Sequence, residues 1–217
     1  MVTRTDSSSP PSAVPDAVAD VPGLLRFETM PRAEALSLAG RMSKESFSYE
    51  EVYGEYVTVH QYIDAPPEAV FEYLTDERHL DEYTYSTRDV RPTDRPGLFV
   101  GRDPLLDDET KIYLRIESDR RALNVDLHCA WDQGEELWMI YLHRIVPAQT
   151  VLGKPGSVVI WTNCRHPYYD KNPYPELASS PDRPWVGDMW SLFYAGHTVE
   201  MQNLKKILEH RHGGEAA

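Results

Sequence analysis

The clearest pattern of hydrophobic and polar positions runs from Pro184 to His212, near the C-terminal end of the chain. At about 100° per residue its apolar side chains share one face, with His197 in the middle of that face and Glu200 at its edge. Asp182 can cap the start, and Gly213 follows the end. We predict one long helix whose core-facing stripe comprises Val186, Met189, Trp190, Phe193, His197, Met201, Leu204, Ile207 and Leu208.

The central part of the chain alternates between apolar and polar residues, which is typical of strands. A first strand is predicted over Tyr53–Ile63. Pro66 and Pro67 then favour a helix start, and the pattern predicts a second short helix that holds Leu80 and Tyr83. Further strands are predicted over Ser86–Val90, Leu98–Arg102, Lys111–Ser118, Ala122–Trp131, Glu136–Val146 and Ser157–Arg165.

The order of these elements indicates a fold class. Short connections favour antiparallel pairing of successive strands, and a single antiparallel sheet must cover its apolar face with another element. Only the C-terminal helix is long enough to do this. The prediction is an α+β fold in which a curved antiparallel sheet wraps around a long C-terminal helix and leaves a cavity between them.

Composition divides the chain into four parts. Residues 1–22 are rich in Ser, Pro, Asp and Ala and lack the apolar segment of a secretory signal, so we expect a disordered tail. Residues 23–52 are predicted to form a helical extension, residues 53–212 the main domain and residues 213–217 a second tail. The loop His166–Arg183 is rich in Pro and Tyr, and we expect it to be ordered.

The charge and the cysteines restrict the partners. With 35 acidic and 22 basic residues the formal net charge is −13, which disfavours nucleic acid and anionic lipid as partners. The longest apolar run, Leu137–Leu142, is far shorter than the roughly 20 residues of a membrane span. Cys129 and Cys164 lie in apolar runs and are expected to be free, buried thiols in a reducing cytoplasm.

A family resemblance appears in residues 57–76, VTVHQYIDAPPEAVFEYLTD. This segment resembles the opening strand, the Ala-Pro turn and the first helix of the START-like, or SRPBCC, superfamily. The resemblance implies the helix-grip fold, which polyketide cyclases and aromatases share with plant pollen-allergen-type proteins and lipid-transfer START domains. It also implies a hydrophobic small-molecule ligand or substrate. It does not distinguish enzymes from carriers or sensors, because the fold is common to all of them.

Strand alternation selects the candidate site residues. If Arg144 faces water, then Tyr141 and His143 face inward. The same argument from Arg165 turns His166 inward, and the helix stripe adds His197. The predicted pocket residues beside these groups are Met139, Ile160, Thr162, Trp190, Phe193 and Met201.

Three functions stay open. In the first, His143, His197 and Tyr141 polarise a ketone or enol and move a proton, giving cyclisation, dehydration or isomerisation of a polyketide-like or aromatic substrate without a cofactor. In the second, the protein binds or carries a lipid, quinone or polyketide without chemistry. In the third, His143, His166, His197 and Glu200 bind zinc or non-haem iron. Histidines that are simply buried and bonded to backbone carbonyls are the non-functional interpretation.

Apolar residues on the opposite faces predict self-association. They lie on the outer side of the C-terminal helix and on the outer side of the strand Glu136–Val146. Exposed apolar patches of this kind mark a partner or a covering segment. The predicted Leu24–Tyr49 helix could cover one patch, and we predict a homodimer that buries the other; the residues concerned are Trp185, Leu192, Val199, Trp138, Ile140 and Leu142.

Overall fold

The computed structural model describes residues 56–84, 87–103, 110–132, 136–177 and 190–212, with the side chains of the last segment described from residue 196 onward. The chain divides into two units, Met1–Glu51 and Val52–Ala217, and the described residues all belong to the second. The predicted tail 1–22, extension 23–52 and tail 213–217 lie outside the described residues, as does the start of the predicted C-terminal helix.

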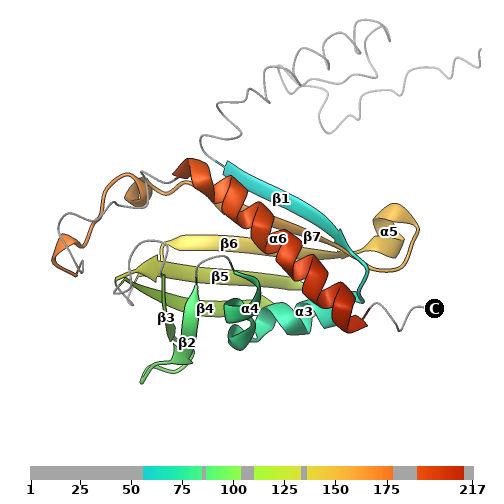
Figure 1. Ribbon diagram of the computed structural model, residues 1–217, viewed down its shortest axis with the longest axis horizontal. Coiled ribbons are helices and arrows are strands. Elements are labelled where there is room, and N and C mark those ends of the chain that lie inside the picture. Colours follow the sequence, from blue (N-terminus) through green and yellow to red (C-terminus); the bar gives the residue numbers. More distant parts are fainter. Residues whose placement is uncertain (1–55, 85–86, 104–109, 133–135, 178–189, 213–217) are drawn as a thin grey trace, which may run out of the picture. The chain divides into compact units, whose positions relative to one another are not determined.

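The second unit is built on a seven-stranded antiparallel sheet with the order β1-β7-β6-β5-β4-β3-β2 (Figure 1). Each strand lies within a few residues of its predicted position. The first strand of the domain, β1, pairs with the last strand, β7, at one edge of the sheet. The strands are β1 (Tyr56–Ile63), β2 (Arg88–Pro92), β3 (Phe99–Arg102), β4 (Lys111–Asp119), β5 (Asn124–Trp131), β6 (Met139–Pro147) and β7 (Ser157–Cys164).

The sheet has one buried and one exposed face, and β6 shows this most clearly. Tyr141 and His143 are buried with their neighbours in the same register, whereas Ile140, Leu142 and Arg144 are exposed. This alternation follows from the period of two in an extended strand. The inward orientation of His143 and Tyr141 predicted from Arg144 is confirmed.

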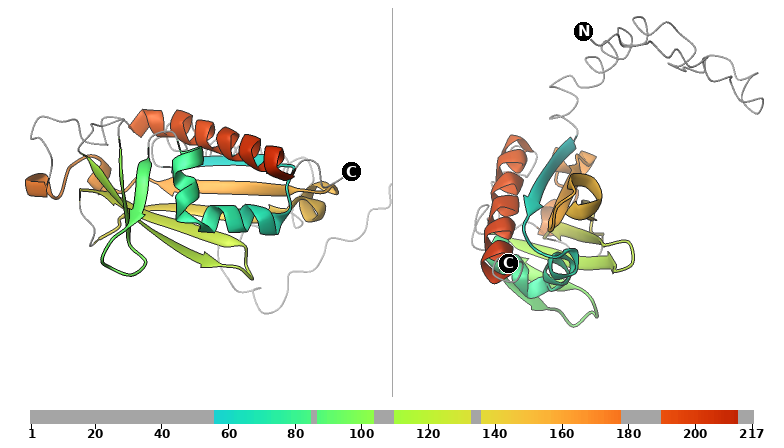
Figure 2. Two further views of the ribbon diagram at one scale, coloured as in Figure 1. Left: turned by 60° about the horizontal axis from the view of Figure 1, so that its bottom comes forward. Right: turned by 90° about the vertical axis from the view of Figure 1, so that its right-hand side faces the viewer.

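Helices cover the buried face (Figure 2). The α-helices are α3 (Pro67–Thr75), α4 (Leu80–Tyr83), α5 (Ala148–Leu152) and α6 (Trp190–His212), and the short 3-10 helices are η3 (Glu77–His79), η4 (Pro167–Tyr169) and η5 (Pro175–Leu177). Helix α3 begins at the predicted prolines and buries Val70 and Phe71. The α+β helix-grip prediction is confirmed, because one sheet packs its apolar face on a long C-terminal helix.

Helix α6 crosses the sheet beside β1 (Figure 1). Its stripe contributes Met201, Leu204 and Leu208 to the core at 3%, 1% and 0% exposure, and each such side chain stabilises the fold by roughly 1.5–3 kcal/mol. At the far end of the domain, the Lys205 ammonium donates to the Tyr62 carbonyl oxygen at 3.1 Å and the Tyr62 hydroxyl donates to the Pro155 carbonyl at 2.8 Å. The Lys205 bond fixes the C-terminal half of α6 to the end of β1, and the Tyr62 hydroxyl bond ties that end of β1 to the segment between α5 and β7.

The orientation predicted for β7 is wrong. Val159, Trp161 and Asn163 face inward, so Ile160 and Thr162 lie on the outer face and Cys164 is exposed. The prediction treated Arg165 as a water-facing residue of the strand, but β7 ends at Cys164. By alternation Arg165 belongs to the same side as the buried Asn163, yet its long side chain still reaches the Asp170 carboxylate.

Trp138 does not face water as alternation along β6 predicts, because it packs on the Pro- and Tyr-rich loop that begins at His166. Trp138 precedes the first residue of β6, and its ring lies 5.0 Å from the Tyr169 ring and 5.6 Å from the Tyr168 ring. Tyr169, in η4, is fully buried and its hydroxyl contacts the amide nitrogen of Asn163 at 3.1 Å. The loop is thus ordered over its described part, and Trp138 is not the exposed interface residue that the sequence predicted.

Candidate functional site

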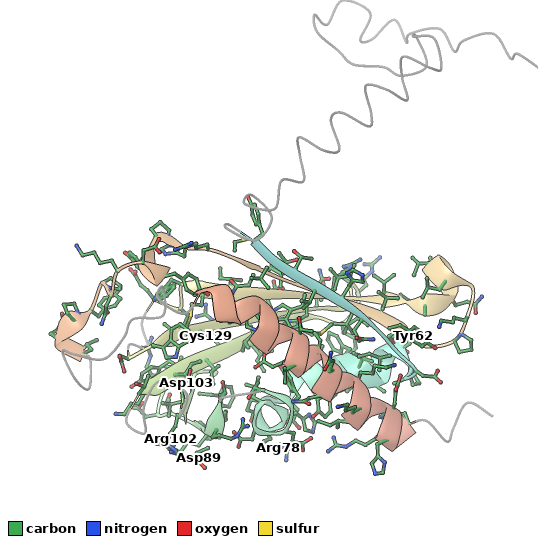
Figure 3. All side chains as sticks on the ribbon, turned by 45° about the horizontal axis from the view of Figure 1, so that its top comes forward. Tyr62, Arg78, Asp89, Arg102, Asp103 and Cys129 are labelled. Carbon is green, nitrogen blue, oxygen red and sulfur yellow. The ribbon has the colours of Figure 1, made fainter. Side chains whose placement is uncertain are left out.

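A cavity of about 40 Å³ lies between the inner face of the sheet, α4 and α6. Its apolar wall comes from α4, β4 and β5, and Tyr83, Trp131, Tyr141 and Trp161 surround it with aromatic rings. Polar groups complete the described lining: Thr84, Thr87, Asp103, Cys129, His197 and Glu200. Figure 3 shows Asp103 and Cys129 together at one end of the domain, with Tyr62 at the other.

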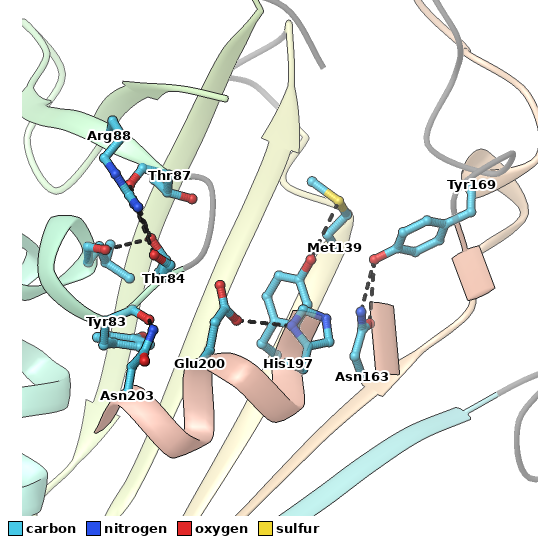
Figure 4. Close-up of polar contacts among 12 residues, drawn as sticks. Tyr83, Thr84, Thr87, Arg88, Met139, Asn163, Tyr169, His197, Glu200 and Asn203 are labelled. Carbon is cyan, nitrogen blue, oxygen red and sulfur yellow. Dashed lines mark hydrogen bonds and ion pairs between the residues drawn. The ribbon is translucent and has the colours of Figure 1, made fainter. Parts of the chain in front are cut away.

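The cavity contains a hydrogen-bonded pair of ionisable side chains (Figure 4). His197 Nδ1 lies 3.0 Å from Glu200 Oε2, and the two side chains are 5% and 7% exposed. They come together because residues three apart share a face of an α-helix. A carboxylate oxygen at this distance can accept the Nδ1–H, which orients the imidazole.

Aromatic rings hold the imidazole in place. The ring of Trp161 lies 4.2 Å from the His197 ring, and that of Tyr141 lies 5.2 Å away, edge-on. The Tyr141 hydroxyl contacts the Met139 sulfur at 3.9 Å. The side chains of Tyr141 and His197, two of the three predicted catalytic residues, thus border one cavity.

A second buried carboxylate, Asp103, was not predicted. It is 3% exposed and accepts a hydrogen bond from Trp131 Nε1 at 2.9 Å. Alternation along β3 gives the signal that could have found it: Gly101 is buried, Arg102 is half-buried and outward, and Asp103 turns inward again. Sequence reasoning also missed Tyr83, Cys129 and Trp161 as lining residues.

Burial and the two carboxylates raise the pKa of two neighbouring groups, the Tyr83 hydroxyl and the Cys129 thiol. Burial raises the pKa of the Tyr83 hydroxyl, and the charge of Glu200 raises it further. Burial likewise raises the pKa of the Cys129 thiol, to which the charges of Glu200 and Asp103 add. Both groups therefore stay protonated at neutral pH, and each can act as a hydrogen-bond donor.

His143 lies outside this lining. It is 3% exposed, and its Nδ1 lies 3.0 Å from the Val125 carbonyl oxygen. Its ring stacks on Trp161 at 5.0 Å, so Trp161 contacts both His143 and His197. Burial lowers the pKa of His143 to about 4, which makes it a neutral imidazole at pH 7.

The predicted convergence of His143, His166, His197 and Glu200 on one metal is wrong. His166 caps η4, where its Nδ1 accepts the Tyr168 backbone N–H at 3.1 Å, and its ring packs 5.5 Å from that of Trp138. Over the described ranges, no group of three or more His, Cys, Asp and Glu side chains has the geometry of a metal site. The Arg165 argument that turned His166 inward failed for the reason given for β7.

The predicted pocket residues separate into three groups. Met139 and Met201 are buried, but Met201 lines a different hollow between β1 and α6, of about 120 Å³. Ile160 and Thr162 lie on the opposite face of the sheet, where the Thr162 hydroxyl contacts that of Thr58 at 3.2 Å. The side chains of Trp190 and Phe193 lie outside the described residues.

Sequence comparison assigns no family. No protein-family model matches the chain. A curated relative, the protein transport protein SEC22 of Eremothecium gossypii, is 39% identical over 64 residues, which is 29% of this chain and 30% of the relative. The match covers less than a third of that relative's length.

Solved structures with a similar arrangement include an aromatase/cyclase, a START superfamily protein and an Aha1 dimer. The Zhui aromatase/cyclase from Streptomyces sp. R1128 is 14% identical over 72% of this chain and 94% of that chain, with a TM-score of 0.49. A START superfamily protein from Mycobacterium smegmatis is 13% identical over 72% and 99%, with a TM-score of 0.46. The Aha1 dimer from Colwellia psychrerythraea is 14% identical over 71% and 96%, with a TM-score of 0.48.

These likenesses carry no argument about activity, because both the identities and the TM-scores are low. The fold assignment rests on the sheet order and on α6. Among the helices that the structure describes, none combines the length and the apolar character needed to cross a membrane.

Proposed function

We propose that the protein is an enzyme that binds a small hydrophobic carbonyl compound in the cavity and moves a proton on it. The observation that carries this proposal is the hydrogen-bonded His197–Glu200 pair, about 95% buried, which lines a cavity with mostly apolar and aromatic walls. Removing ionisable groups from water costs several kcal/mol per ion. Ionisable groups placed in this way are characteristic of functional sites.

His197 is the proposed acid/base group. Glu200 accepts its Nδ1–H and fixes the ring, so Nε2 is the atom that would exchange a proton with the substrate. An imidazole suits this role because its ordinary pKa lies near neutrality. Removing a proton next to a carbonyl and returning it elsewhere gives isomerisation, dehydration or cyclisation, depending on the substrate.

Tyr141 is proposed as the hydrogen-bond donor to the substrate carbonyl oxygen. Its hydroxyl borders the same cavity as His197, and a donor aimed at the developing oxyanion lowers the barrier for proton removal. Asp103 and Trp131 would fix the orientation of the other end of the ligand. We assign His143 to support rather than catalysis, because it is outside the cavity lining and its ring stacks on Trp161.

The size of the cavity bears on the substrate. A volume of about 40 Å³ holds about one to three water molecules, whereas drug-sized ligands occupy roughly 300–1,000 Å³. A larger ligand would therefore extend beyond this volume or displace lining side chains, and a small ring compound needs less extra room than a long polyketide. Trp131 and Trp161 line the cavity, so binding should change the tryptophan fluorescence.

The alternative function is binding of the same class of ligand without chemistry. To separate the two, purified protein is incubated with cell extract and the small molecules are compared by mass spectrometry before and after incubation. Catalysis predicts a compound that wild type converts and that His197→Asn and Glu200→Gln do not convert. His143→Gln is the matched control, and it should retain at least about a tenth of the rate.

A ligand recovered unchanged from wild type, and held equally by Glu200→Gln, would contradict catalysis and support a carrier. Folding of each variant is checked by circular dichroism and thermal unfolding. Loss of conversion counts only when the variant stays folded.

Two further parts of the proposal concern the cellular compartment and the oligomeric state. Cys129 and Cys164 are both free thiols, which suits a reducing compartment such as the cytoplasm. The outer face of the sheet exposes Ile140 and Leu142 at 40% and 45%, and we propose that a second copy of the chain covers them. Neither part affects the chemistry assigned to the cavity.

A further inference from the structure

A second hollow, of about 450 Å³, lies on the outer face of the sheet over β2, β3 and β4. Its lining includes the cationic side chains Arg91, Arg95 and Lys111, with one carboxylate, Asp94. The ring of Tyr113 and the side chain of Val100 contribute to its wall. This hollow belongs to the face of the sheet opposite the His197–Glu200 cavity.

Strand register explains why the cations converge. Arg91 pairs with Val100 and Val100 pairs with Tyr113, so these three side chains follow one another across the outer face. Lys111 lies two residues from Tyr113 and therefore shares its face. Arg95 stands in the hairpin that the Thr93 N–H closes on the Leu98 carbonyl oxygen, at 2.9 Å.

The charge of this hollow contrasts with that of the chain. The formal net charge is −13, yet three cations and one carboxylate line the hollow. The neighbouring cations on the same face have carboxylate partners: Arg102 with Asp89 (Figure 3) and Arg115 with Glu117. Arg91 instead donates to the Asp89 backbone carbonyl at 3.3 Å, so its charge still favours an anion in the hollow.

The geometry of the edge argues against an added peptide strand. The β2–β3 register shifts between Arg88 and Arg91, Asp89 has a φ of 57°, and β2 ends at Pro92. Bulges, prolines and charges of this kind blunt a sheet edge against strand addition. The volume lies instead in the range of small-molecule sites, and a phosphate group accepts hydrogen bonds from several Arg and Lys donors at once.

We propose that this hollow binds a phosphate-bearing organic anion of about nucleotide size, with its phosphates on Arg91, Arg95 and Lys111 and its organic part against Tyr113. The proposal does not depend on the chemistry of the cavity. The probes are ADP and inorganic pyrophosphate, and binding is measured by isothermal titration calorimetry on the full chain.

Arg91→Gln and Lys111→Gln are each expected to weaken ADP binding about tenfold, the usual effect of losing a charge-assisted hydrogen bond. Tyr113→Ala should weaken ADP binding and leave pyrophosphate binding unchanged. Arg115→Gln is the matched control, because it removes one positive charge from the same face of β4 outside the hollow. His197→Asn, in the cavity, should leave both affinities unchanged.

Three results would overturn this assignment. The first is the absence of saturable ADP binding at concentrations up to about 10 mM. The second is an equal loss of affinity in Arg115→Gln and Lys111→Gln, which would make the effect one of total charge. The third is an ADP affinity that Tyr113→Ala leaves unchanged, which would show that the organic part of the ligand does not bind against Tyr113.

Discussion

At the scale of single residues, the burial of His143 makes the free energy of unfolding depend on pH. Its pKa is lowered to about 4 from an ordinary value of 6.5, with burial as the main cause. Between these values the unfolded chain binds the proton and the folded chain does not, so the free energy of unfolding falls as the pH falls. We expect a loss of roughly 3 kcal/mol between pH 6.5 and pH 4 from this residue, measured by urea unfolding.

The control for this prediction is His143→Gln, whose amide can still donate to the Val125 carbonyl but does not titrate. The unfolding free energy of wild type minus that of this variant should fall by roughly 3 kcal/mol as the pH falls from 6.5 to about 4, and should stay constant above pH 6.5. A difference that stays constant from pH 7 to about pH 4 would show that His143 titrates normally.

Single residues also show where sequence reasoning succeeds and fails. Arg144 lies in the middle of β6 and faces water, so the orientation of Tyr141 and His143 followed from it. Arg165 lies after the end of β7, where a long side chain can reach solvent from either face. The sequence does not mark the last residue of a strand, so the same argument turned Ile160 and Thr162 the wrong way.

At the scale of elements, the orientation of β7 can be tested by its cysteine. Cys164 is exposed and Cys129 is buried, so a thiol reagent should label wild type once under native conditions and twice after unfolding. The reacting site is Cys164, and Cys164→Ser should show no fast labelling. Fast labelling of Cys129 in that variant would mean that β5 does not face the core as described.

The elements themselves were largely predictable. Alternation gave all seven strands, Pro66 and Pro67 gave the start of α3, and the apolar stripe gave α6, because each depends on neighbours close in sequence. The cavity depends on contacts between distant segments. Asp103 directly follows β3, Trp131 ends β5 and Trp161 lies in β7. These residues line one cavity with His197 only through the sheet order, which no local pattern contains.

At the scale of the whole molecule, the exposed apolar side chains of β6 and α6 predict self-association. Ile140 and Leu142 are exposed on β6, and Val199 is 45% exposed on α6, whereas Trp138 packs within its own chain. We expect light scattering to give twice the mass of one chain, and Leu142→Glu to give a single-chain mass. Thr150→Glu, exposed on α5, is the control and should leave the dimer intact. A single-chain mass for wild type at high concentration would contradict this.

The central claim is that a ligand enters the cavity and contacts the His197–Glu200 pair. The most direct measurement is a nuclear magnetic resonance titration of protein labelled with ¹⁵N in its histidine rings, using a panel of small cyclic ketones and phenols. We predict that a binding compound shifts the ring nitrogens of His197, leaves those of His60 unchanged, and loses affinity in Glu200→Gln. Compounds that bind while the His197 signals stay fixed would contradict the claim.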